Sequence, residues 1–124
     1  MAKVFLDANY FIALVNRAPE PDAQDLDEHR GFISTLSCHI LFYVNKISVP
    51  DAKMNSFIKD FNLIDLSQEI LDRALKGPTT DLEDNIQLHS AAEAECDLFL
   101  TEDRKLLDLK FFGKTQIVNT LVQP

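Results

Sequence analysis

Two short apolar runs in this chain each lead into an aspartate. Val4-Phe5-Leu6 is followed at once by Asp7, and Leu98-Phe99-Leu100 leads shortly into Asp103. Each run has the length and residue types of a buried parallel strand, and each precedes a helix-compatible stretch. In open parallel sheets, ligand-binding and catalytic groups collect just beyond the carboxyl ends of the strands. Two aspartates at the ends of neighbouring strands would converge, which points to a site for a divalent cation.

Strand-like and helix-like segments alternate along the chain, and this alternation predicts a three-layer α/β/α sandwich around a short parallel sheet. The predicted strands are Lys3–Leu6, Gly31–Leu36, Asn62–Leu66, Leu98–Thr101 and Thr115–Val118. The predicted helices are Asn9–Asn16, Cys38–Lys46 with Ser37 as its N-cap, Asp51–Phe61, one that Ser67 begins and Gly77-Pro78 ends, one from Thr80 or Asp81 to about Glu95, and a turn at Leu106–Leu109.

Length and composition predict one domain over residues 1–124. The chain has 124 residues, of which 46% are hydrophobic, so it suits a single core. It shows no membrane-spanning run and no secretory signal pattern, and we expect the folded domain to begin at Lys3. Cys38 and Cys96 lack metal-ligand spacing and are expected to be reduced, which indicates a cytoplasmic protein.

The net charge of −8 argues against a protein that coats nucleic acid, because such proteins are normally basic. It does not exclude a nucleic-acid enzyme, since a carboxylate metal site itself adds negative charge. Arg104, Lys105, Lys110 and Lys114 cluster after the second aspartate. This basic group is either a rim that holds a phosphate backbone near the cation or an ordinary solvated surface.

A third candidate acid lies at the start of the helix that ends near Glu95. At helical spacing, Asp84 shares a stripe with Leu88 and Ala91, which belong to the core-facing side. Asp84 therefore enters the protein at the mouth of the buried face. The alternative is that its carboxylate only favours the helix N-terminus.

These motifs, taken in order, resemble the PIN-domain family of proteins similar to the N-terminal domain of PilT. The matching segments are Val4–Asn9, Asp81–Gln87 and Asp97–Asp103, and the resemblance covers essentially the whole chain. It implies an α/β/α sandwich around a parallel sheet and a Mg²⁺- or Mn²⁺-dependent ribonuclease. VapC-type toxins of bacterial toxin–antitoxin pairs belong to this family, so the resemblance also implies a homodimer and an antitoxin protein as partner. By position, it makes Asp7, Asp84 and Asp103 the metal-binding acids.

The chain departs from the family at one position. The usual second acid, commonly Glu, lies early in the helix after the second strand, and residues 37–44 contain no acid. His39 is the side chain there able to take its place, and the surrounding run resembles a PIN subgroup with histidine at this position. Alternatively, His39 is a core histidine that bonds a backbone carbonyl. Because imidazole suits Mn²⁺ better than Mg²⁺, a histidine ligand would favour Mn²⁺.

The predicted reaction is metal-assisted hydrolysis of RNA phosphodiesters by Asp7, Asp84 and Asp103. Asn9 either orients the water or phosphate or caps the first helix. Thr101 is expected to hydrogen-bond a ligating carboxylate. Arg104 and Lys105 are the candidates for contact with the RNA backbone. The competing prediction is a catalytically weak or inactive RNA-binding or protein-interaction module, with the segment Glu20–Glu28 and the pair Phe111-Phe112 as partner surfaces.

Overall fold

The computed structural model describes residues 2–17 and 29–121, so the segment Glu20–Glu28 lies outside the described residues. A six-stranded sheet with the order β3-β2-β1-β4-β6-β5 forms its centre. The strands are β1 (Lys3–Leu6), β2 (Arg30–Ser34), β3 (Asn62–Ile64), β4 (Leu98–Leu100), β5 (Phe111–Phe112) and β6 (Thr115–Val118). All pairs are parallel except β5 with β6. The parallel sheet predicted from the alternation is therefore confirmed, with one antiparallel edge strand added.

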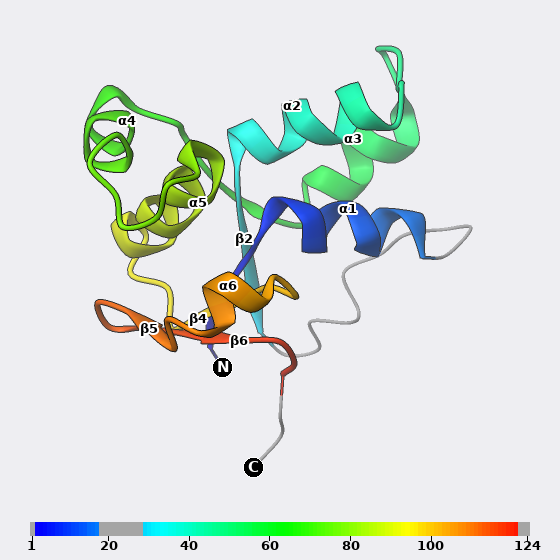
Figure 1. The fold of residues 1–124 in the computed structure, drawn as a ribbon. Helices are drawn as coiled ribbons and strands as arrows, with labels where there is room; N and C mark the ends of the chain where they lie inside the picture. Colours follow the sequence, from blue (N-terminus) through cyan, green and yellow to red (C-terminus); the bar gives the residue numbers. More distant parts are fainter. Residues whose placement is uncertain (1, 18–28, 122–124) are drawn as a thin grey trace.

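Helices cover both faces of the sheet (Figure 1). They are α1 (Ala8–Asn16), α2 (Thr35–Val44), α3 (Ala52–Ile58), α4 (Gln68–Ala74), α5 (Leu82–Glu93) and α6 (Arg104–Leu107). Side chains alternate between the faces of a strand, and β1 shows the consequence. Val4 and Leu6 pack with α1, α2 and α3, whereas Phe5 packs on the other face with α5 and α6. The fold is the predicted three-layer α/β/α sandwich.

The helix boundaries follow the capping residues. Asp51, Ser67 and Asp81 each accept a hydrogen bond from a backbone amide in the first turn of α3, α4 and α5 respectively. Helix α2 differs from the prediction, because Ser34 rather than Ser37 is its N-cap and accepts a bond from the amide of Leu36 at 3.1 Å. The helix consequently begins earlier than expected, and Ser37 becomes an interior helical residue.

Strand β5 was not predicted, because two residues are too short to give a periodic signal. It pairs with β6 through a tight hairpin in which Phe112 lies opposite Thr115. Gly113 stands in the turn with a φ of 61°, a conformation that glycine adopts without steric cost. Within the described residues, no helix is long and apolar enough to cross a membrane.

Candidate functional site

Three polar residues lie level with one another at the carboxyl edge of the sheet. Phe5 pairs with Phe32, and Leu6 pairs with Leu100. One step past β1, the register therefore places Asp7 between Ser34 of β2 and Thr101 after β4. Asp7 is 3% exposed, and the two hydroxyl residues are fully buried. A buried carboxylate flanked by two hydroxyl groups is the centre of the candidate site.

Thr101 connects the two aspartates that follow β1 and β4. Its Oγ1 donates to Oδ2 of Asp7 at 2.8 Å and accepts from the backbone amide of Asp103 at 3.0 Å. The hydrogen bond expected from Thr101 to an acid of the site is thus present. Asp103 is half-buried and caps α6, since its Oδ1 accepts from the amide of Lys105 at 2.9 Å. The short link through one threonine fixes both acids at neighbouring strand ends.

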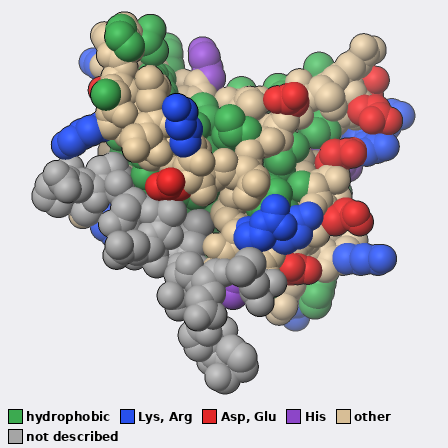
Figure 2. Space-filling view, turned by 180° about the vertical axis from the view of Figure 1, so that it is seen from behind, with side chains coloured by type: hydrophobic (Ala, Val, Ile, Leu, Met, Phe, Trp, Pro, Cys, Tyr) green, Lys and Arg blue, Asp and Glu red, His purple; other side chains and the backbone are tan. Residues whose placement is uncertain are grey.

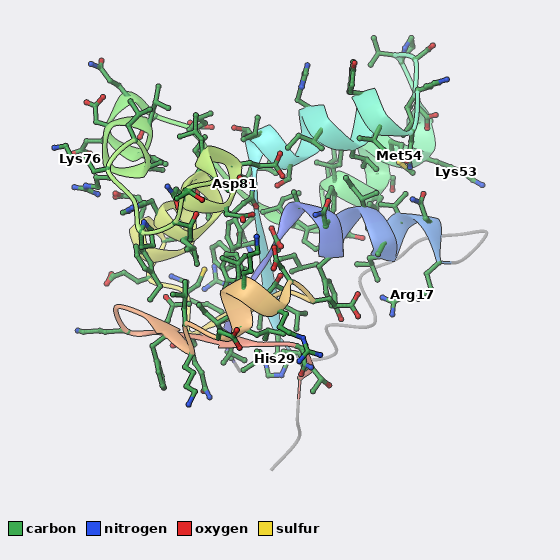
Figure 3. The ribbon with its side chains drawn as sticks, in the orientation of Figure 1. Arg17, His29, Lys53, Met54, Lys76 and Asp81 are labelled. Carbon is green, nitrogen blue, oxygen red and sulfur yellow. The ribbon has the colours of Figure 1, made fainter. Side chains whose placement is uncertain are left out.

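Helix α5 brings the third acid to this edge. Figure 3 shows Asp81 at the start of α5, on the side that faces the first turns of α1 and α2. Oδ1 of Asp81 accepts from the amide of Asp84 at 3.0 Å, which fixes the first turn of the helix. Leu88 and Ala91 are fully buried, as their place on the core-facing stripe predicted, and Asp84 lies half-buried above them.

The carboxylates lie in one another's electric field. Burial raises the pKa of Asp7 from 3.8 to about 6, and the negative charges of Glu83 and Asp103 add to this effect. Burial also raises the pKa of Asp84 to about 6, with further contributions from Asp81, Asp7 and Asp103. Burial is the larger cause of both shifts, and neighbouring negative charges add to it because proximity of like charges disfavours ionisation.

Convergence stops short of a ready coordination shell. Within residues 2–17 and 29–121, no three Asp, Glu, His or Cys side chains are close enough together to hold an ion as they stand. A cavity of about 300 Å³ opens beside Asp7 and is lined by Asn9, Tyr10, Glu102 and Asp103. Asn9 is exposed and lies within α1, one residue past its start, while Asp7 holds the N-cap position. The Asn9 amide is thus placed at the cavity rather than at the helix cap.

The structure does not bring His39 to the acids. Its side chain is exposed and lines a separate, open and largely apolar groove with Thr35, Cys38 and Phe42. The early start of α2 explains this placement, because Ser37 and Leu41 are the residues that face inward. A residue two positions from each of them points about 200° away, toward solvent. The expected preference for Mn²⁺ rested on this histidine and loses its basis.

The basic residues after Asp103 lie at two different ends of the sheet. Arg104 and Lys105 occupy the first turn of α6, directly beyond the acid that caps it, and both are exposed. Lys110 and Lys114 are exposed in the segment that forms β5 and its turn. Arg104 and Lys105 directly follow Asp103, which lines the cavity, whereas Lys114 lies beside Asp97 at the amino end of the sheet. The position of Arg104 and Lys105 is compatible with phosphate binding as well as with simple solvation.

Two buried polar residues, which were not among the predicted site residues, connect α2 with α5. Ser37 of α2 donates from Oγ to Oε1 of Gln87 in α5 at 3.3 Å, and both side chains are fully buried. Nε2 of Gln87 has no hydrogen-bond partner. The signal that could have revealed Gln87 is its spacing, since it lies on the Asp84–Ala91 stripe at the third position after Asp84.

The chain has a PIN-like α/β/α fold, and the following two solved structures share this architecture. A chain of a toxin–antitoxin complex from Klebsiella pneumoniae superposes with a TM-score of 0.64 at 18% identity, over 91% of this chain and 95% of that one. A chain of VapBC2 from Rickettsia felis, bound to a DNA fragment from their promoter, superposes with a TM-score of 0.63 at 15% identity, over 93% and 96%. No protein-family model and no curated protein matches the chain. At these identities the likeness establishes the fold.

Proposed function

We propose that this chain is a divalent-metal-dependent ribonuclease of the VapC type. The observation that carries the proposal is the position of the three acids: Thr101 links Asp7 to the backbone of Asp103 at neighbouring strand ends, and the charges of both raise the pKa of Asp84 at the start of α5. Such an arrangement is unfavourable without a cation, and perturbed carboxylates in a cavity are typical of functional sites. The likeness of the fold to chains from toxin–antitoxin complexes supports the same function.

The residues present fit a hard divalent cation by their chemistry. The available donors are carboxylate, hydroxyl and amide oxygens, the ligands that Mg²⁺ and Mn²⁺ accept. Asp7, Asp84 and Asp103 would hold the ion, of which Asp7 is buried and the other two are half-buried. A bound divalent cation supplies a more acidic water and neutralises charge on a phosphate. Because the donors are oxygens, we propose either Mg²⁺ or Mn²⁺.

The other side chains position the site and the substrate. Thr101 holds the orientation of the Asp7 carboxylate through its hydrogen bond. The side-chain amide of Asn9, at the cavity, orients the attacking water or a phosphate oxygen. Arg104 and Lys105 bind the RNA backbone on the outer side of α6. His39 takes no part, because it lies in the other groove.

We further propose a protein partner, an antitoxin or a second copy of the chain, for the surface of α2 and α3. Tyr43 and Val49 are 79% and 77% exposed, and Figure 2 shows hydrophobic side chains exposed at this end of the molecule. Large apolar side chains grouped in this way mark interaction surfaces. In size-exclusion chromatography with light scattering, Tyr43→Asp should abolish a homodimer formed here. A Tyr43→Asp variant that still dimerises would show that the dimer interface lies on another surface. The proposed cellular location is the cytoplasm.

A catalytically inactive interaction module is the second candidate, and one observation favours it. No acid stands on α2, and the acids present do not yet form a coordination shell within the described residues. Both candidates predict RNA or protein binding, and cleavage separates them.

The test is cleavage of a single-stranded and a hairpin RNA in Mg²⁺, in Mn²⁺ and in EDTA. Wild-type protein should cleave with either metal and not in EDTA, and Asp7→Asn should lose at least a hundredfold of the rate. Asp65→Asn, a change at an exposed acid after β3, is the matched control and should cleave like the wild type. Cleavage that survives Asp7→Asn would contradict the proposed site, and RNA binding without cleavage would favour the second candidate.

A further inference from the structure

The buried pair Ser37 and Gln87 leaves one polar atom without a partner. Gln87 is fully buried, its Oε1 accepts from Ser37, and its Nε2 makes no hydrogen bond. An unpaired buried amide group destabilises a fold, and buried polar groups are otherwise almost always paired. A side chain amide can present either its oxygen or its nitrogen to a given neighbour. If Nε2 faces Ser37, then Oε1 is the atom left free, so one amide edge stays unused in both orientations.

The spacing along α5 directs the unused edge of the amide toward the acids. Gln87 and Asp84 are three positions apart on α5 and therefore share one face of the helix. Side chains of a helix tilt toward its N-terminus, so the amide of Gln87 extends toward the turn that carries Asp84. Ser37, which contacts this amide, lies one turn into α2, and the N-cap of α2 is level with Asp7 across the sheet. Helix geometry and the contact with Ser37 together direct the amide toward the space between Asp7 and Asp84.

We propose that Gln87 is a fourth ligand side chain of the carboxylate site and supplies an uncharged amide oxygen to a divalent cation, while Ser37 fixes the orientation of the amide. This inference rests on the metal-dependent function proposed above. Amide oxygens are regular ligands of hard cations, and Ser37 can accept from Nε2 when Oε1 turns toward the ion. The ligand absent from α2 is then provided by α5. An uncharged ligand such as the Gln87 amide also adds no negative charge to the repulsion among the acids when no cation is bound.

Mn²⁺ binding to the full-length protein, followed by electron paramagnetic resonance of the free ion, tests this inference without reference to activity. Gln87→Met keeps the length of the side chain and removes the amide, and should weaken Mn²⁺ binding about tenfold or more. Gln87→Glu restores an oxygen ligand with a charge and should bind Mn²⁺ at least as tightly as the wild type. Ser37→Ala leaves the amide unfixed and should weaken binding by a smaller factor.

Ser90 provides the matched control. It lies one turn further along α5, it is also fully buried, and its hydroxyl likewise lacks a partner. Because Ser90 is one turn further from Asp84, Ser90→Ala should leave Mn²⁺ binding unchanged. Wild-type affinity in Gln87→Met, together with lost binding in Asp7→Asn, would overturn the role of Gln87 and leave the proposed function standing. Failure of the wild type to bind Mn²⁺ would refute the proposed function and this inference with it. If Gln87→Met does not fold, Gln87→Glu and Ser37→Ala still decide the question by their opposite shifts.

Discussion

The ionised carboxylate of Asp7 destabilises the metal-free protein, and removal of its charge should make the protein more stable. Burial raises the pKa of Asp7 from 3.8 to about 6, and its side chain is 3% exposed. A shift of about 2 pKa units corresponds to about 3 kcal/mol at pH values above both pKa values. Asp7→Asn keeps an oxygen that accepts the hydrogen bond from Thr101. We therefore expect a gain of up to about 3 kcal/mol at pH 8.

The dependence on pH follows from the sign of this shift. A raised carboxyl pKa favours the protonated folded state, so its stabilising effect is complete below pH 3.8 and is lost as pH rises through about 6. Urea unfolding in EDTA at pH 4, 6 and 8 should show wild type and Asp7→Asn equally stable at pH 4 and separated at pH 8. Asp65→Asn, the exposed control, should show no such separation. A mutant that is no more stable than the wild type at pH 8 would refute the reasoning.

Two further predictions concern neighbours of the site. Thr101→Val removes the donor to Asp7 and the acceptor for the amide of Asp103, and should lower the free energy of unfolding by about 1–3 kcal/mol in urea titrations. Thr120→Val, at an exposed position, is the control. An unchanged unfolding midpoint for Thr101→Val would show that neither hydrogen bond stabilises the fold. His39→Ala should change the free energy of unfolding by no more than about 0.5 kcal/mol, because the side chain is exposed. It should also leave the rate of RNA cleavage unchanged. A large loss of cleavage would show that His39 belongs to the catalytic site.

The parts of the fold that the sequence predicted are those with strong local signals. Val4–Leu6 is an uninterrupted apolar run, and β1 has the predicted bounds Lys3–Leu6. Ser67 and Asp81 stand before amphipathic stretches, and both cap the helices that follow. Asp7 and Asp103 end or follow buried strands, so their common edge follows from topology alone. The sheet and its acidic edge were therefore predictable.

The start of α2 was not predictable because several residues there can cap a helix. Ser34, Thr35 and Ser37 all have side-chain oxygens suited to an N-cap. Tertiary structure determines that Ser34 is the N-cap, because strand β2 ends at this residue, level with Asp7. This shift turned Ser37 inward and His39 outward, which altered the expected composition of the site.

The polar contact between α2 and α5 was likewise invisible in the sequence. Ser37 and Gln87 are separated by 50 positions, and each has an ordinary surface-compatible side chain. Their burial depends on the contact between α2 and α5, which cover opposite faces of the sheet, and no local sequence pattern encodes that contact. Long-range pairs of this kind required the structure.

Mn²⁺ binding to single Asn variants shows whether Asp7, Asp84 and Asp103 form one cation site. Isothermal titration should give a measurable Kd for the wild type and a loss of at least tenfold in affinity for each of the three variants. Glu93→Gln, an exposed change on the same helix as Asp84, should bind like the wild type. Wild-type affinity in Asp84→Asn or Asp103→Asn would contradict the claim, because the acids would then not share one ion.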